Sequence, residues 1–90
     1  MAIAVQIYSR PGCHLCDEMK KVVSRVARTI PLTVQEIDIS GDRHLEASYG
    51  LEVPVLMIDG RKAAKFRVTD EELRRILASR TPSAPADDPP

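Results

Sequence analysis

The sequence predicts a single α/β domain whose strands and helices follow the order β-α-β-α-β-β-α. Two observations predict this class. Over the first 80 residues, short β-branched runs alternate with stretches whose apolar residues recur at helical spacing. Helical connections make the early strands parallel, whereas the turn signal Asp59-Gly60 makes the last two antiparallel. We therefore expect a four-stranded mixed sheet with helices on both faces.

The first strand and the first helix have clear patterns. Residues 3–8 alternate as expected for a central strand, and Arg10-Pro11-Gly12 breaks the run. Residues 13–29 follow with a single helical stripe, after which Pro31 ends the helix. The stripe consists of Leu15, Met19, Val22, Val23 and Val26.

The second strand is expected over residues 32–39. Its apolar residues change parity, because Leu32 and Val34 alternate out of step with Ile37 and Ile39. The run is short and β-branched, so it predicts a strand, whereas the change of parity leaves open which face its side chains occupy.

The rest of the domain predicts a short helix, a hairpin and a last helix. The segment Ser40-Gly41-Asp42 can cap a helix through Tyr49, with Gly50 as its stop. Residues 55–58 and 62–67 supply the two hairpin strands.

The last helix begins with a capping box. Thr69 can accept a hydrogen bond from the amide of Glu72, whose side chain can reach back to Thr69. Leu73, Ile76 and Leu77 then form its inner face.

Composition excludes several classes of function. Lys and Arg number 13, and so do Asp and Glu, so the formal net charge is +0. A neutral chain lacks the basic excess that is typical of nucleic-acid binders. The chain also has only two Tyr, one Phe and no Trp, too few aromatic residues for a surface on which bases stack. The longest apolar run is far shorter than the ~20 residues of a membrane span. The amino terminus does not resemble a signal peptide, so we expect a cytoplasmic protein with no membrane contact.

The carboxyl end differs in composition from the rest. Residues 81–90 read TPSAPADDPP and contain no large apolar residue. Such a segment cannot bury enough surface to offset its ordering entropy. The sequence therefore predicts one domain over residues 1–80 and a disordered Pro-rich tail over residues 81–90.

The chemistry of the chain is concentrated at Cys13 and Cys16. This C-x-x-C pair follows a strand and opens a helix, so the two sulfurs lie on one turn, close enough for a disulfide. Cys13 occupies the helix cap, where unpaired amides and the helix dipole favour a thiolate. Cysteines so placed have pKa values of about 3.5–7.5. The Cys13 thiolate would attack a disulfide, and the more buried Cys16 would resolve the product.

Two neighbours can influence this pair. Arg10 is either a second positive charge near Cys13 or a solvated surface arginine, and the sequence leaves both interpretations open. A charged His14 would favour the thiolate, although an exposed side chain of weak influence is the simpler interpretation.

Zinc binding is the main alternative for a C-x-x-C pair. Zinc usually takes four ligands, and this chain offers only two cysteines and two histidines. His14 cannot easily share one metal with both adjacent cysteines, and His44 is isolated. We therefore expect no metal site within one chain.

The segment Val53-Pro54 is the second signal. Proline donates no hydrogen bond and suits the start of a strand. Composition alone predicts a trans peptide bond here, since only ~5–6% of X-Pro bonds in folded proteins are cis.

Together these motifs resemble the thioredoxin superfamily, and specifically a small glutaredoxin-like protein. The resemblance rests on Ile7-Tyr8-Ser9-Arg10, on Pro11-Gly12-Cys13-His14-Leu15-Cys16 and on Val53-Pro54, and covers residues 3–79. It implies a thioredoxin fold with sheet order 2-1-3-4, a nucleophilic Cys13 and a resolving Cys16. It also implies a cis Pro54 beside the dithiol and a Val53 backbone that pairs with an extended disulfide substrate.

The chain departs from the glutaredoxin pattern at three places. His14-Leu15 replaces the usual Pro-Tyr or Gly-Phe pair, and Glu52 replaces a threonine before Val53-Pro54. The Gly-Gly-x-Asp turn that holds glutathione is missing, and only Thr69-Asp70 stand near that place. The fold and the dithiol chemistry therefore carry over better than glutathione specificity does.

The resemblance leads us to expect a thiol–disulfide oxidoreductase. The catalytic residues would be Cys13 and Cys16, and the substrate-binding residues Arg10, His14, Val53 and Pro54. The substrate would be a protein or low-molecular-weight disulfide, and glutathione or a thioredoxin reductase would restore the dithiol. We expect a monomer with no resident cofactor.

Two other classes of function stay open. Two subunits could share an iron–sulfur cluster through Cys13, with glutathione as the remaining ligand, because such clusters need four ligands. A redox-inert adaptor of the same fold is the third interpretation, which an intact dithiol disfavours.

Overall fold

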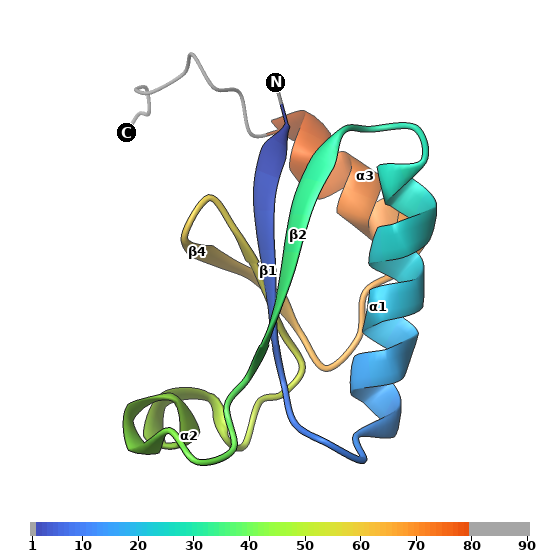
Figure 1. Ribbon diagram of the computed structural model, residues 1–90. Helices are drawn as coiled ribbons and strands as arrows, with labels where there is room; N and C mark the ends of the chain where they lie inside the picture. Colours follow the sequence, from blue (N-terminus) through green and yellow to red (C-terminus); the bar gives the residue numbers. More distant parts are fainter. Residues whose placement is uncertain (1, 80–90) are drawn as a thin grey trace.

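The computed structural model describes residues 2–79 and has the predicted order of elements (Figure 1). They are β1 (Ile3–Ser9), α1 (His14–Ala27), β2 (Leu32–Asp38), α2 (Arg43–Tyr49), β3 (Val55–Ile58), β4 (Arg61–Lys65) and α3 (Asp70–Ser79). The tail predicted over residues 81–90 lies outside the described residues. Within residues 2–79, no helix is both long and apolar enough to cross a membrane.

The four strands form one mixed sheet in the order β2-β1-β3-β4. β1 runs parallel to β2 and antiparallel to β3, and β3 is antiparallel to β4. The predicted mixed sheet and the implied order 2-1-3-4 are therefore confirmed. α1 and α3 cover one face, and α2 lies on the other side, near the carboxyl ends of β1 and β2 (Figure 1).

The main core lies between the sheet and the α1–α3 layer. Register pairs Val5 with Ile58 and Ile7 with Leu56, so these four side chains point to the same face. The predicted stripe of α1 packs on them through Met19, Val22, Val23 and Val26, together with Leu73 and Leu77 of α3. Leu15, the first residue predicted for the stripe, is only partly buried and lies outside this core cluster. The core that holds α1 against the sheet is thus built from residues whose burial the sequence predicts.

The parity change in β2 has a structural cause. Leu32 is the partner of Ile3 and packs against the core on the helix face, whereas Ile37 is the partner of Tyr8 on the opposite face. β2 is an edge strand, and Val34 is 44% exposed. Because helices lie on both sides of the sheet, apolar residues of either parity find a partner layer.

The predicted caps are present. Asp42 accepts a hydrogen bond from the amide of Leu45 at 3.0 Å. The hydroxyl of Thr69 accepts from the amide of Glu72 at 3.0 Å, and the Glu72 carboxylate accepts from the amide of Thr69 at the same distance. These bonds satisfy amides that would otherwise be unpaired at the starts of α2 and α3.

The last strand is shorter than predicted. Residues 62–67 were expected to form it, but β4 spans Arg61–Lys65. The strand ends there because Phe66 has a φ of 68°, a left-handed conformation outside the extended region that strand residues occupy. A register shift between Leu56 and Met57 also makes the β3–β4 pairing irregular.

Candidate functional site

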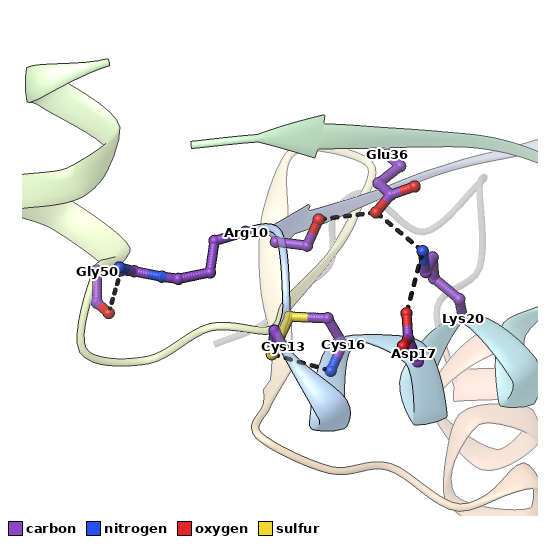
Figure 2. The surroundings of a disulfide bond; sticks show 8 residues. Arg10, Cys13, Cys16, Asp17, Lys20, Glu36 and Gly50 are labelled. Carbon is purple, nitrogen blue, oxygen red and sulfur yellow. Dashed lines mark hydrogen bonds and ion pairs between the residues drawn. A yellow bond between two sulfur atoms is a disulfide. The ribbon is translucent and has the colours of Figure 1, made fainter. Parts of the chain in front are cut away.

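The two cysteines lie together at the amino end of α1. Cys13 is the N-cap residue, in an extended conformation with φ −90° and ψ 113°. Its Sγ accepts a hydrogen bond from the backbone amide of Cys16 at 3.1 Å (Figure 2). The pair forms a disulfide, with its Cα atoms 5.2 Å apart. The predicted proximity and the predicted cap position are both confirmed.

The two sulfurs differ in their surroundings. Cys16 is only 2% exposed and belongs to the buried side of α1, whereas Cys13 is partly exposed. Cys13 follows a turn in which Gly12 has a φ of 76°, a conformation that glycine adopts without steric cost. Cys13 is therefore the more exposed of the two cysteines.

The Val53–Pro54 peptide bond is cis. The trans bond predicted from composition is therefore wrong, and the cis bond implied by the resemblance is present. Pro54 is buried, and its carbonyl accepts a hydrogen bond from the amide of Phe66 at 2.8 Å. The next residue, Val55, is the partner of Tyr8. Pro54 thus lies at the end of the sheet where β1 leads toward Cys13.

The structure places Arg10 against α2. Its guanidinium donates to the carbonyl of Gly50 at 2.7 Å and to the carboxylate of Glu46 at 3.1 Å. The side chain extends away from the two cysteines toward Gly50 (Figure 2). Its direct partners are therefore groups of the protein itself.

His14 points into solvent. Its side chain is 85% exposed, and its Nε2 lies 3.9 Å from the carboxylate of Glu18 one turn along the helix. This exposure agrees with the simpler of the two interpretations of His14.

A polar cluster beside the dithiol was missed by the sequence analysis. The hydroxyl of buried Ser9 donates to Glu36 at 2.8 Å, and Lys20 lies 3.1 Å from the same carboxylate and 3.4 Å from that of Asp17 (Figure 2). The hydrogen bond to Glu36 raises the pKa of Lys20 above its ordinary value, and the charge of Glu36 adds to this. The spacing of Asp17 and Lys20 on one helix face was the only signal in the sequence.

This cluster borders a cleft of about 440 Å³ that reaches Cys16. Besides Cys16, the cleft is lined by residues that carry hydroxyl, carboxylate and ammonium groups, among them Ser9, Glu36 and Lys20. Within residues 2–79, no group of three or more His, Cys, Asp or Glu side chains is arranged to hold a metal ion.

A dithiol at the start of the first helix, on a βαβαββα sheet with a cis-proline before β3, defines a glutaredoxin-like protein of the thioredoxin fold. A family model described as "Glutaredoxin-like domain (DUF836)" matches residues 4–78. The chain belongs to this family.

Known proteins agree with this assignment. The "Glutaredoxin-like protein YDR286C homolog" of Dictyostelium discoideum is 31% identical over 78 residues, which are 80% of this chain and 72% of that protein. The crystal structure of the structural genomics target XcR50 of X. campestris has a TM-score of 0.74 at 32% identity, over 86% of this chain and 99% of that one. A mutant thioredoxin of Halobacterium salinarum has a TM-score of 0.61 at 23% identity, over 86% of this chain and 73% of that one, a similarity that shows the fold alone.

Proposed function

We propose that the protein is a thiol–disulfide oxidoreductase with Cys13 as the nucleophile and Cys16 as the resolving cysteine. The hydrogen bond from the Cys16 amide to the Sγ of Cys13 carries this proposal. In the reduced protein the same amide would stabilise a thiolate at the cap position. The positive end of α1 acts in the same direction.

The reaction has two exchange steps. The Cys13 thiolate attacks one sulfur of the substrate disulfide, forms a mixed disulfide and releases the other sulfur as a thiolate, which takes up a proton. Cys16 loses its proton and attacks the Sγ of Cys13, which breaks the mixed disulfide and releases the second substrate thiol. The substrate gains two electrons, and the protein ends with the Cys13–Cys16 disulfide seen in the structure.

An external reductant must supply two electrons to close the cycle. Glutathione or a thioredoxin reductase is the source that we propose. The Arg10 guanidinium already has two protein partners, and the backbone amide of Thr69 already donates to the Glu72 carboxylate. These commitments leave fewer donors for the carboxylates of glutathione and favour a protein reductase.

Substrate contact is proposed for the residues around Cys13. The Val53 backbone, next to the cis-proline, would pair with an extended segment of the substrate, as in strand addition. Exposed His14 would lie beside the same segment.

Trapping of the mixed disulfide tests the proposal. Cys16→Ser should accumulate one adduct with a disulfide peptide, because Cys13 can attack but no second sulfur can resolve. Intact-mass spectrometry with peptide mapping should place the adduct on Cys13. The matched variant Cys13→Ser should form no adduct and reduce no disulfide. An unmodified Cys13 in the first variant, or efficient trapping at Cys16 in the second, would contradict the assignment.

A further inference from the structure

A second cleft lies beside the dithiol, between α1 and the connection from β4 to α3. It has a volume of about 480 Å³, which is within the ~300–1,000 Å³ range of ligand clefts. Buried Met19, Val22 and Val68 contribute to its lining, so part of the cleft is apolar. His14 and Leu15, the two residues between the cysteines, also line it. A polypeptide bound through Cys13 would therefore pass next to this cleft.

Arg67 brings a positive charge to this cleft. Other cations around the dithiol are paired: Arg10, Lys20 and Lys62 each lie within 3.1 Å of a carboxylate. In the part of the chain that the structure describes, residues 2–79, the Arg67 guanidinium has no such ion pair or side-chain hydrogen bond. The carboxylate of Glu18, which also lines the cleft, lies 3.8 Å from Lys21 and 3.9 Å from His14. The charge of Arg67 is therefore available to an incoming group.

The backbone before Arg67 is held in an uncommon conformation. Phe66 has a φ of 68°, and the amide of Arg67 donates to the carbonyl of Lys65 at 2.7 Å. A positive φ with a hydrogen bond between residues two apart matches the rarer, strained form of the γ-turn. For a bulky residue such as phenylalanine this conformation is a genuine outlier, and such outliers cluster at functional sites.

Resting on the proposed function, we propose that this cleft selects the disulfide substrate. It takes an apolar side chain close to the substrate cysteine, with an acidic side chain beside it on the guanidinium of Arg67. The apolar lining of the cleft is complementary to the apolar side chain of the substrate, and the unpaired charge of Arg67 is complementary to the acidic one. The preferred substrate is therefore a polypeptide disulfide flanked by apolar and acidic residues, and Arg67 is a specificity-determining residue.

A matched series of peptide disulfides tests this inference. Three peptides share one neutral scaffold and differ only in the pair of residues placed on each side of the cysteine. The pair is Leu and Glu in the first peptide, Leu and Lys in the second, and Ser and Glu in the third. The wild-type protein should reduce the Leu-Glu peptide with a kcat/KM about twofold to fivefold above that of the Leu-Lys peptide at low salt, as expected for one exposed ion pair. Added salt should diminish this ratio. The Ser-Glu peptide should also react more slowly than the Leu-Glu peptide.

Variants of Arg67 should change the ratio between the peptides. Arg67→Gln should abolish the preference for Glu over Lys, and Arg67→Glu should reverse it. Arg61→Glu is the matched control, because it makes the same charge change at an exposed arginine. Arg61 lies beside the β3–β4 turn, which is hydrogen-bonded to the amino-terminal end of β1, whereas the dithiol follows the carboxyl-terminal end. This variant should leave the ratio unchanged. A ratio of two rates on one protein sample is insensitive to partial unfolding of a variant.

Three results would overturn the inference alone. Equal kcat/KM values for the Leu-Glu and Leu-Lys peptides in the wild-type protein would remove its basis. An unchanged preference in Arg67→Glu, or an effect of this variant on glutathione disulfide but not on the peptides, would show that Arg67 does not select polypeptides. In these cases the oxidoreductase assignment stands. Absence of turnover with every disulfide would overturn that assignment and this inference with it.

Discussion

The guanidinium of Arg10 donates a hydrogen bond of 2.7 Å to the carbonyl oxygen of Gly50 (Figure 2). Arg10 lies three residues before Cys13, and Gly50 lies three residues before Val53. The bond therefore joins the loop that carries the dithiol to the segment that leads into the cis-proline. Gly50 also ends α2, so a cation there meets the negative end of that helix.

Loss of this bond should destabilise the protein. Arg10→Gln should lower the free energy of unfolding by about 1–2 kcal/mol, because a charge-assisted hydrogen bond and an ion pair are lost together. Glu46→Gln is the matched comparison, since it removes the ion pair and leaves the bond to Gly50 intact. It should cost only ~0.2–1 kcal/mol. Urea unfolding measures both, and equal costs for the two variants would contradict the role of the Gly50 bond.

Gly50 should not tolerate a side chain. Its φ is −55°, which alanine adopts freely, so backbone preference alone predicts that alanine stabilises this position. However, a Cβ atom there would lie 2.5 Å from the carbonyl oxygen of Glu46 and 3.3 Å from the Arg10 guanidinium. We expect Gly50→Ala to destabilise the fold by about 1–3 kcal/mol, the usual cost of overpacking. A rise in the thermal midpoint would show that this contact is easily relieved.

The ion pair of Arg25 and Asp70 should make the free energy of unfolding depend on pH in the acid range. The Arg25 guanidinium donates two bonds, of 2.9 and 2.8 Å, to the Asp70 carboxylate, which lowers the pKa of Asp70 below its ordinary value of 3.8. Because the folded-state pKa is the lower one, the stabilisation is complete above the unfolded value. It is lost as the pH falls through the folded value.

The measurement for this pair is the free energy of unfolding as a function of pH. Asp70→Asn should be less stable than the wild-type protein at neutral pH, and the two curves should converge in acid. Glu71→Gln is the control, because it removes a carboxylate from the same helical turn without touching Arg25. A constant difference between the Asp70→Asn and wild-type curves at all pH values would rule out this linkage.

The fold was predictable because its signals are local. The stripe from Met19 to Val26, the capping box of Thr69 and the cap of Asp42 all depend on neighbours within a few residues, and the structure has each of them. The position of Cys13 at the cap follows in the same way, because Gly12 and a strand precede it.

Other features of the site depend on residues far apart in the sequence. The partners of Arg10 lie 36 and 40 residues away, and Glu36 lies 27 residues from Ser9. No periodicity in the sequence contains such pairings. The early end of β4 was also missed, because nothing in the residue type of Phe66 indicates a positive φ.

The central claim is that the amino end of α1 makes Cys13 a reactive thiolate. The most direct test is the pH dependence of alkylation of reduced Cys16→Ser, in which Cys13 is the only thiol. We expect Cys13 to titrate well below the pKa of ~8.5 of a free cysteine, because the helix cap stabilises its charged form. Titration at or above that value would contradict it.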